Sequence, residues 1–357
     1  MEVAVLGAGA GGQAAAAVLA RRGHRVRLYN RSPARLEPLR AAGGLTISGD
    51  QGEGFVALPH LTTDAAAAVR GAEAVLIFVG ANGQADVARA IAPALADGQI
   101  VVFCSGSAGS LEAARLWREG GLEARVLLGE TVSLPQSART TGPAQLKIRL
   151  PVRPHAAAFP AAATDRLRER LAPLFETQPA VNVLDTGLNN PNFLIHPAPM
   201  VVNYAAIERA DGALSLMNEG MTPATLRLMD AHDAEKLALA RALGLPARTL
   251  DDVYLSLGSG PHVYRQPGEP MGLRDRIHWR YIDEDVPMGT VLWSSLGRAL
   301  GVPTPLSDGI VAIAGALRGR DYRADGRTVE TLGLAGLDAV GITHYLATGE
   351  RPGERRG

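Results

Sequence analysis

Three glycines near the start of the chain have the spacing that brings a polypeptide backbone close to a phosphate. Gly7, Gly9 and Gly12 follow an apolar run at residues 2–6 and precede an alanine-rich stretch of helical length. The first glycine permits a tight turn, the second lets the backbone approach a pyrophosphate, and the third lets a helix pack closely on a strand. A helix that begins here would offer free N–H groups to the anion. The motif therefore predicts a dinucleotide site.

The residues after the second predicted strand indicate which dinucleotide binds. NAD sites usually place Asp or Glu at this point to bind the ribose 2′-hydroxyl, but this chain has Asn30, Arg31 and Ser32. A guanidinium pairs with a 2′-phosphate, and the amide and hydroxyl can hydrogen-bond to it. We therefore predict NADP as the preferred cofactor. NAD is the alternative if Arg31 is only a solvated loop residue.

An enzyme that moves a hydride also needs to move a proton, and histidine is the usual acid or base near neutral pH. His196 lies in the segment NNPNFLIHPAP at the entry to the second half, where an inter-domain cleft is expected. Because Pro197 disfavours helical backbone before it, we expect His196 at a helix start or break; a structural histidine is the competing interpretation. Seven other histidines lie in contexts that favour structural or solvated roles: His24, His60, His155, His232, His262, His278 and His344. Of these, His232 lies in the charged helical stretch DAHDAEK and is expected to be solvated or to cap a helix.

A second cluster of charged residues occupies positions 274–287, directly before an apolar segment with a helical pattern. One interpretation is a solvated charged loop. The other is that Arg280 binds a substrate carboxylate through two N–H donors while one of the acids orients a histidine. The spacing does not indicate which acid this is.

These residues require two different kinds of domain to position them. Up to about residue 186, short β-branched runs alternate with alanine-rich helical segments, a pattern typical of βαβ units and a parallel sheet. Beyond that point the chain has long segments in which apolar residues recur with a period of 3.6 residues, as in a helix. We therefore predict an α/β domain over residues 1–186, a Rossmann-type, doubly wound parallel sheet that binds NAD(P). Residues 187–357 are predicted to form a mainly α-helical substrate domain.

Smaller features of the first domain can also be predicted. The pieces GGLTISG and GEGFVALP read as a hairpin, because two short strand patterns are separated by Gly and Asp. Extended runs at residues 144–150 and 180–184 are expected to add strands after the main repeat. In the second domain, Thr222 is predicted to cap a helix that begins at Pro223, and Gly244 to end it.

Composition excludes several functional classes. The 36 basic and 36 acidic side chains give zero formal charge at pH 7, which removes the broad positive field that nucleic acid or anionic lipid needs. One cysteine excludes an internal disulfide, and no Cys/His cluster has zinc-ligand spacing, so we predict no metal. No apolar run approaches the roughly 18 residues of a membrane helix. We expect a cytoplasmic homodimer whose partners are small molecules.

Together, these pieces resemble the octopine/nopaline dehydrogenase family, the opine dehydrogenases. The resemblance covers nearly the whole chain and rests on GAGAGG, CSGSAGS, GETVSLPQSAR, NNPNFLIHPAPMVVNYAAIE and RYIDEDVPMG. It implies a dinucleotide-binding domain, a helical domain and a site between them. It also implies NAD(P)H-dependent reductive condensation of an α-keto acid, such as pyruvate, with the amino group of an amino acid. By resemblance, His196 is the catalytic acid or base, Asp285 its orienting carboxylate and Arg280 the keto-acid ligand.

Other interpretations stay open. The resemblance implies that the loop at Gln136 helps shape the amine side of the site, and relatives often have an aromatic residue at this position, so this loop differs here. A ketopantoate-type or 2-hydroxy-acid reductase also joins a glycine-rich domain to a helical one, but it usually uses a lysine, and this chain has only Lys147 and Lys236. A non-catalytic nucleotide sensor would keep the glycines without needing His196, Arg280 and Asp285 to meet.

Overall fold

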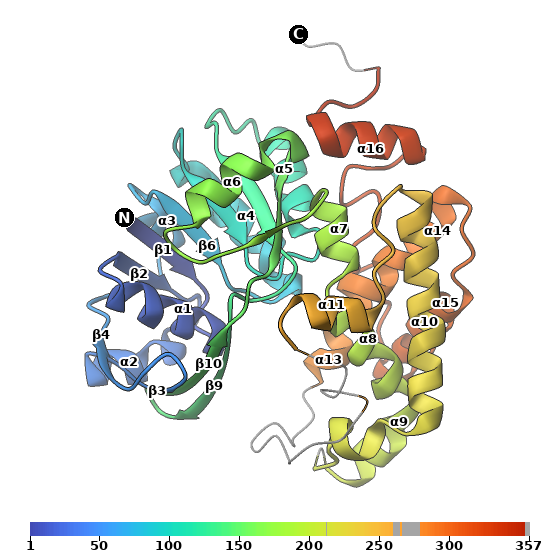
Figure 1. Cartoon of the computed structure of the whole chain (residues 1–357), viewed down its shortest axis with the longest axis horizontal. Coiled ribbons are helices and arrows are strands. Elements are labelled where there is room, and N and C mark those ends of the chain that lie inside the picture. Colours follow the sequence, from blue (N-terminus) through green and yellow to red (C-terminus); the bar gives the residue numbers. More distant parts are fainter. Residues whose placement is uncertain (212, 260–264, 266–278, 354–357) are drawn as a thin grey trace. The chain divides into compact units, whose positions relative to one another are not determined.

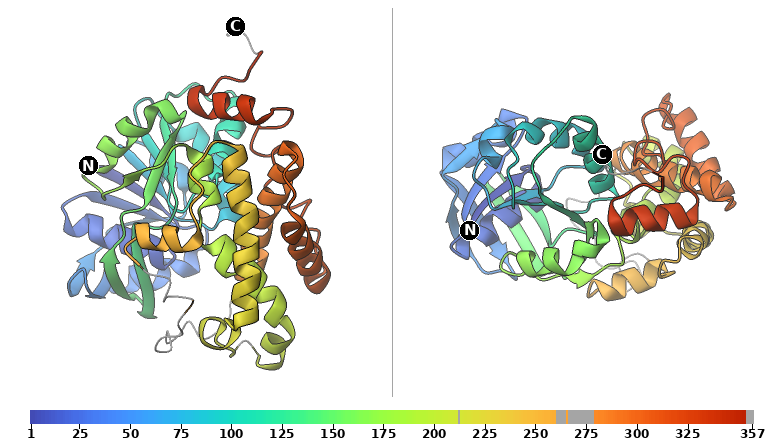
Figure 2. Two further views of the ribbon diagram at one scale, coloured as in Figure 1. Left: turned by 45° about the vertical axis from the view of Figure 1, so that its right-hand side comes forward. Right: turned by 90° about the horizontal axis from the view of Figure 1, so that it is seen from above.

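The first half of the chain forms a largely parallel sheet and the second half forms helices, which confirms the predicted fold class (Figure 1). The computed structural model describes residues 1–211, 213–259, 265 and 279–353. One unit comprises Met1–Thr186 and Leu346–Gly349, and the other comprises Gly187–Tyr345 and the residues from Glu350. Figure 2 shows the strands in the blue-to-green part of the chain and helices in the yellow-to-red part.

The main sheet of the first unit has eight strands in the order β12-β11-β8-β7-β6-β1-β2-β5, and only β8 and β11 pair antiparallel. The order reverses between β1 and β6, so the turns after these strands meet at the switch point where such sheets bind ligands. The strands are β1 (Glu2–Leu6), β2 (Arg25–Tyr29), β5 (His60–Thr62), β6 (Ala74–Ile77), β7 (Ile100–Phe103), β8 (Leu127–Thr131), β11 (His155–Phe159) and β12 (Gln178–Pro179).

Alternate residues of the strands belong to two separate hydrophobic cores, one on each face of the main sheet. Val3 and Val5 belong to one core, while Ala4 and Leu6 belong to the other. Helices α1 and α6 cover the first face, and α3, α4 and α5 cover the second, as a doubly wound sheet requires. The helices of this unit are α1 (Ala10–Arg21), α2 (Glu37–Ala42), α3 (Ala65–Val69), α4 (Gln84–Ile91), α5 (Gly109–Glu119) and α6 (Thr164–Leu171).

Helix α1 is rich in alanine because it is covered on two sides. It packs on β1 and β2 and also on a small sheet of order β4-β3-β10-β9. Ala14 to Ala17 are at most 2% exposed, and larger side chains there would push the sheets apart. The predicted hairpin is confirmed as the antiparallel pair of β3 and β4. The strands of the small sheet are β3 (Gly44–Gly49), β4 (Gly54–Ala57), β9 (Gln136–Gly142) and β10 (Gln145–Pro151).

The prediction of a strand at residues 180–184 is wrong. The chain turns into helix α7 (Val183–Leu188) instead. Asn182 Oδ1 accepts hydrogen bonds from the N–H groups of Leu184 and Asp185, and Asp185 Oδ2 accepts one from Val181. These two side chains satisfy the free N–H groups of the first turn, so local capping outweighs the β-branched pattern.

The described part of the second unit is helical. Thr222 Oγ1 accepts the Thr225 N–H at the start of α10, and Gly244 has φ of +65° beyond its end, which confirms both predicted caps. No helix in the described ranges has the length and apolar character to cross a membrane. Besides α7, the helices are α8 (Asn192–Ile195), α9 (Pro197–Arg209), α10 (Pro223–Ala242), α11 (Leu250–Ser256), α13 (Arg280–Asp283), α14 (Val291–Leu300), α15 (Pro305–Arg318) and α16 (Ala339–Thr348).

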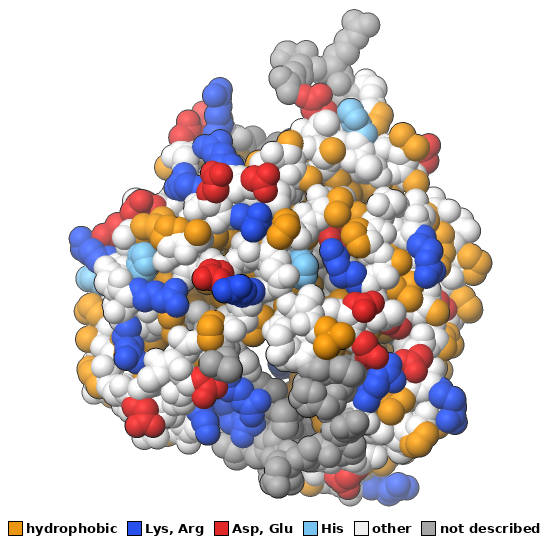
Figure 3. Space-filling model, in the orientation of Figure 1, with side chains coloured by type: hydrophobic (Ala, Val, Ile, Leu, Met, Phe, Trp, Pro, Cys, Tyr) orange, Lys and Arg blue, Asp and Glu red, His pale blue; other side chains and the backbone are white. Residues whose placement is uncertain are grey.

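Charged side chains of both signs are mixed on the one face of the molecule that Figure 3 draws. On the face drawn in Figure 3, Lys and Arg side chains lie among Asp and Glu side chains rather than in one field. This distribution agrees with a chain of zero formal charge. A face of this kind presents no single-sign field to a highly charged polymer.

Candidate active site

His196 and Asp285 meet inside the second unit, although 89 positions separate them in the sequence. His196 Nδ1 lies 2.7 Å from Asp285 Oδ2, and the two residues are 6% and 4% exposed. A buried carboxylate on Nδ1 fixes the tautomer of an imidazole and leaves Nε2 to exchange protons. The structure therefore selects Asp285 from the acids in the charged cluster as the partner of the histidine.

Proline explains why His196 stands where two helices meet. It follows α8, which ends at Ile195, and it precedes α9, which begins at Pro197. Its φ and ψ of −110° and −61° differ from those of a regular helix, while its carbonyl still accepts the Met200 N–H at 2.9 Å. The predicted helix break at His196 is confirmed, because the residue before a proline is driven out of regular helical backbone.

The surroundings of Asp285 make its negative charge costly. Burial raises the pKa of the carboxyl well above its usual range, and Glu284 raises it further, whereas Arg280 acts in the opposite direction. An ionised Asp285 is therefore stabilised most when the neighbouring imidazole carries a proton. The pair is suited to take up and release one proton as a unit.

Each of the three acids at 283–285 has a different partner. Asp283 accepts hydrogen bonds from Arg318 Nε at 3.0 Å and Nη2 at 2.7 Å, and a further short one from the Tyr322 hydroxyl. Burial alone would raise the pKa of Asp283, but these donors outweigh burial and lower it. Glu284 lies 3.4 Å from Arg280 Nη1. Asp283 thus anchors α13 to α15. Glu284 pairs with Arg280, the residue predicted to bind the substrate carboxylate.

Arg280 remains accessible despite its partner. Its side chain is 58% exposed, and its charge acts on Asp285. Its guanidinium carbon lies 5.3 Å from the centre of the Tyr281 ring. A guanidinium in this setting can exchange an exposed ion pair for a ligand carboxylate at little cost, because exposed pairs contribute little stability.

The glycine turn of the first unit fits a dinucleotide pyrophosphate. Gly7 has φ of +114°, and a Cβ on Gly12 would lie 1.8 Å from the Gly7 carbonyl oxygen, so neither position admits a side chain. A Cβ on Gly9 would meet nothing within 4 Å, which leaves open space beside the turn. No side chain caps α1, and its first turn carries no acid. The free N–H groups of α1 are therefore available to an anion.

The three residues after β2 differ in what their side chains do. Asn30 Oδ1 accepts the Ala8 N–H at 3.0 Å, and its Nδ2 donates to the Ser32 carbonyl at 3.0 Å. The amide of Asn30 therefore holds the glycine turn against the end of β2. Arg31 is 85% exposed and lies 3.8 Å from Asp86, and Ser32 is exposed before a short 3-10 turn. Arg31 and Ser32 are thus accessible to a ligand.

Two residues near the predicted sites were missed by sequence reasoning. Tyr281 stacks on His196, with ring centres 3.9 Å apart and an angle of 11° between the planes. Its place next to Arg280 was a signal, but nothing local indicates its partner. Glu130 is fully buried on β8, where burial raises the pKa of its carboxyl. A glutamate within an otherwise apolar strand pattern could have been noticed.

Glu130 holds the turn between β7 and α5. Its carboxylate accepts hydrogen bonds from the Ala108 N–H, the Ser110 N–H, the Ser110 hydroxyl and the Thr186 hydroxyl, at 2.6 to 3.1 Å. Ser107 and Ala108 in this turn have φ of 54° and 64°, a backbone conformation that residues other than glycine rarely adopt. The bonds to Glu130 stabilise the turn in that conformation and cap α5.

The other candidate residues do not join this site. Lys147 is exposed on β10, and Lys236 is buried with its Nζ 2.7 Å from Asp233. The expectation that His232 is solvated or caps a helix is wrong, since this residue is fully buried within α10 and its Nε2 lies 3.1 Å from the Ser307 hydroxyl. His262 and His278 lie outside the described residues.

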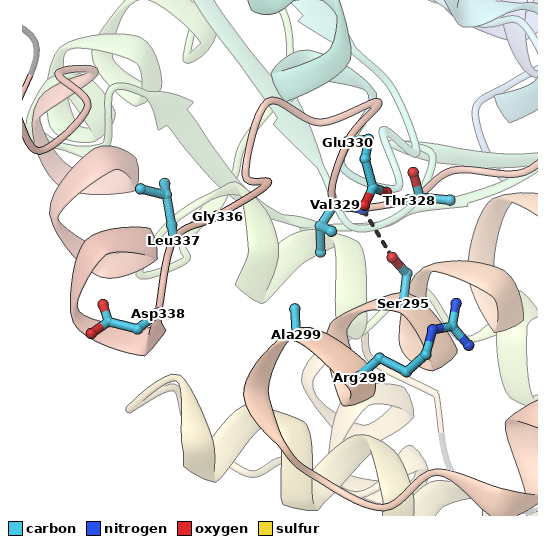
Figure 4. A pocket seen from close by; sticks show the side chains of 9 residues that line it. All are labelled: Ser295, Arg298, Ala299, Thr328, Val329, Glu330, Gly336, Leu337 and Asp338. Carbon is cyan, nitrogen blue, oxygen red and sulfur yellow. Dashed lines mark hydrogen bonds between the residues drawn. The ribbon is translucent and has the colours of Figure 1, made fainter.

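A separate cavity of about 570 Å³ lies in the second unit (Figure 4). Ser295 and Arg298 of α14 line one side, and Thr328 and Glu330 line another. Ser295 Oγ accepts the Val329 N–H at 3.0 Å, so this hydroxyl serves the local backbone. Neither member of the His196–Asp285 pair lines the cavity.

Comparisons with known proteins agree with both halves of the structure. A family model described as NAD/NADP octopine/nopaline dehydrogenase, alpha-helical domain, matches residues 179–318, and one described as ketopantoate reductase PanE/ApbA matches residues 3–148. The chain is 35% identical to the opine dehydrogenase of Arthrobacter sp. (strain 1C) over 353 residues, which cover 95% of this chain and 97% of the relative.

Two solved structures have a similar fold. Octopine dehydrogenase with NADH and pyruvate gives a TM-score of 0.71 at 20% identity over 99% of both chains. Apo yersinopine dehydrogenase gives a TM-score of 0.72 at 16% identity over 93% of this chain and 97% of the other. At these identities, the likeness concerns the fold.

Proposed function

This chain belongs to the opine dehydrogenase family and is an NAD(P)-dependent oxidoreductase that acts on CH–NH donors. From that premise we propose the residues that carry the reaction: His196 as acid and base, Asp285 as the carboxylate that orients it, and Arg280 as the ligand of the keto-acid carboxylate. The reaction reversibly condenses an α-keto acid with the amino group of an amino acid and reduces the imine to an N-(carboxyalkyl) amino acid. The bound nicotinamide supplies the hydride.

The 2.7 Å bond between His196 and Asp285 is the observation that supports the acid–base role. Condensation requires a proton to leave the attacking amine and a proton to reach the carbinolamine oxygen, which then departs as water. His196 Nε2 takes the first proton and gives the second. Asp285 holds Nδ1–H throughout and stabilises the imidazolium that forms between the two transfers.

Arg280 is proposed to bind the keto-acid carboxylate because it is an exposed, planar donor whose charge already acts on Asp285. Binding of a carboxylate by two parallel N–H donors fixes the orientation of the keto group. In the absence of substrate, Glu284 pairs with the Arg280 guanidinium. Substrate and Glu284 therefore compete for the same donors.

We propose NADP as the preferred cofactor and NAD as the weaker one. Arg31 and Ser32 are accessible after β2, and no carboxylate stands at the end of that strand to bind a ribose 2′-hydroxyl. Among the similar structures, octopine dehydrogenase was solved with NADH and yersinopine dehydrogenase with NADP⁺, so relatives use both. We expect Arg31→Ala to raise KM for NADPH about tenfold while leaving KM for NADH unchanged. Equal changes for both cofactors would contradict the preference.

The substrates are proposed to be a pyruvate-like keto acid and an amino acid. Solved octopine dehydrogenase holds pyruvate in one structure and L-arginine in another. In this chain Gln136 is buried, and among the described residues its Oε1 has no hydrogen-bond partner. We propose that this oxygen accepts a hydrogen bond from the amine substrate. A Gln136→Leu variant should then change the ranking of amino acids without changing KM for the keto acid.

The decisive experiment measures NADPH consumption with pyruvate alone and then with a panel of amino acids. Consumption that depends on the amine supports the proposal. Consumption with keto acid alone would favour a ketopantoate-type reductase, whose family model matches only the first unit of this chain. The buried ion pair of Lys236 with Asp233 argues against that alternative, because it leaves no accessible lysine there to act as the acid. No consumption at all would favour a nucleotide sensor.

We also propose a cytoplasmic homodimer. Helix α15 leaves Ile313 50% exposed and Leu317 41% exposed on one face, which is apolar surface that a second copy could cover. Light scattering should give twice the monomer mass, and Ile313→Glu should halve it. A monomeric wild type would contradict this arrangement. Fractionation of cells that produce the protein tests the location.

A further inference from the structure

Tyr281 contacts both residues proposed to handle the substrate, yet it has no part in the mechanism above. Its ring lies parallel to the His196 imidazole at 3.9 Å and lies 5.3 Å from the guanidinium carbon of Arg280. We propose that Tyr281 is a positioning residue that fixes the plane of the His196 ring and thereby keeps Nε2 aimed at the reacting atoms. This inference rests on the proposed acid–base role of His196.

The stack and the Asp285 bond restrain different motions of the His196 ring. The bond holds the Nδ1 atom in place. A parallel ring at 3.9 Å is at van der Waals distance, so a tilt toward Tyr281 would bring the two rings into collision. The bond therefore restrains the position of Nδ1, and the stack restrains tilting of the imidazole toward Tyr281.

The tyrosine can do this because its own helix is anchored. Two residues after Tyr281, Asp283 receives two hydrogen bonds from Arg318 of α15. Two residues before it, Trp279 lies 4.8 Å from the Arg318 guanidinium and 5.2 Å from the Tyr204 ring. The short helix α13 is therefore attached on both sides of Tyr281, and the ring is held rigidly against His196.

The stack also suits the charge that His196 acquires during turnover. The face of a phenol ring is electron-rich, so it attracts a cation above it more than a neutral ring. When His196 takes the proton of the amine, the imidazolium therefore gains attraction from Tyr281 as well as from Asp285. The ring supports the charged intermediate without exchanging a proton itself.

The test compares Tyr281→Leu with Tyr281→Phe. We expect Tyr281→Leu to lower kcat about tenfold, because the acid–base group is misplaced but still present, while KM for the cofactor stays unchanged. Tyr281→Phe keeps the ring and should retain kcat within about twofold. A Tyr281→Phe variant as slow as Tyr281→Leu would show that the hydroxyl, not the stack, matters, and would overturn the proposal.

Two further measurements separate this idea from a loss of folding and from a failure of the proposed function. In proton NMR of the whole enzyme, the strongly hydrogen-bonded Nδ1–H of His196 should give a far-downfield signal. That signal should broaden in Tyr281→Leu and persist in Tyr281→Phe. Tyr345→Leu replaces another buried tyrosine of the same unit, one that the anchoring of α13 does not use, and it should lower stability without changing kcat. If His196→Ala is inactive but Tyr281→Leu is fully active, only the stacking proposal fails; if His196→Ala is active, the proposed function itself fails.

Discussion

Among the described residues of the second unit, two histidines are buried, and their surroundings differ in one decisive respect. His196 is 6% exposed, lies against the Tyr281 ring and bonds to the carboxylate of Asp285. His232 is fully buried, lies 4.8 Å from the Trp293 ring and bonds to the hydroxyl of Ser307. Both are thus enclosed, next to an aromatic ring and hydrogen-bonded. Only His196 has a partner that can stabilise a positive charge.

The charged neighbours reinforce this difference. Burial, with a smaller effect of the Lys236 cation, lowers the pKa of His232 to about 3, so this ring stays neutral at all physiological pH values. His196 instead shares its proton with a carboxylate whose own pKa burial raises. The comparison teaches that burial and aromatic packing do not distinguish the histidine proposed as acid and base from a structural one. The ionisable partner does.

The largest expected effect is on turnover. His196→Ala and Asp285→Asn should each lower kcat by about 10²-fold or more, the loss expected when acid–base assistance is removed. His232→Gln should leave kcat within about threefold of wild type, because a ring that stays neutral does not take up and release a proton near neutral pH. Steady-state kinetics with keto acid, amino acid and NADPH check all three. Equal losses at both histidines would break the comparison.

The same pair of histidines shows how far the sequence could predict the site. Pro197 marked His196 as a helix break, and the charged cluster at 274–287 marked a region for its partner, but the choice of Asp285 came from the family resemblance and not from the spacing. His232 was expected to be solvated because it lies in the charged stretch DAHDAEK. In the structure Glu235 of that stretch accepts the N–H groups of Leu306 and Ser307, some 71 positions away. A linear pattern gives residue types but not such distant partners.

The fold followed the same rule. Segments with local signals, such as the glycine turn, the alanine-rich α1 and the caps of α10, were predictable. The second sheet was only partly predictable. Strand β3 pairs with β10, about a hundred residues later, and the sequence of neither strand indicates its partner. The stack of Tyr281 on His196 was missed for this reason. Contacts of high sequence separation are set by packing, which single-residue patterns do not encode.

The second largest effect is on stability in acid. His232 has a folded-state pKa of about 3, below its unfolded value near 6.5, so the unfolded chain binds a proton that the folded chain rejects. Stability is therefore lost as pH falls through 6.5 toward 3, at up to about 1.4 kcal/mol per pH unit. Between pH 6.5 and 5, wild type should lose about 2 kcal/mol more than His232→Gln in urea unfolding. Parallel losses in the two proteins would mean that His232 is not buried as a neutral ring.

The carboxylate of the active pair should behave in the opposite way. The folded-state pKa of Asp285 is raised, so its contribution to stability is present at low pH and is lost as pH rises above the unfolded value near 4. Asp285→Asn removes this charge and keeps an acceptor for His196. At pH 7 the variant should therefore unfold with a free energy equal to wild type or about 1 kcal/mol higher, although it is nearly inactive. A loss of several kcal/mol would show that the charged pair supports the fold rather than the reaction.

The smallest expected effect is on KM for the keto acid, and it concerns the cation near each histidine: Arg280 near His196 and Lys236 near His232. Arg280 is 58% exposed beside the active pair, whereas Lys236 is 1% exposed and paired with Asp233. Arg280→Lys replaces a planar fork by a point charge and should raise KM for the keto acid about fivefold with little change in kcat. Lys236→Met removes a cation that no substrate can reach, so it should leave KM unchanged while altering stability. Each variant alters one cation near one buried histidine, so the two are matched. A rise in KM for the keto acid in Arg280→Lys alone would assign carboxylate binding to the accessible guanidinium. An unchanged KM in Arg280→Lys would remove Arg280 from the site.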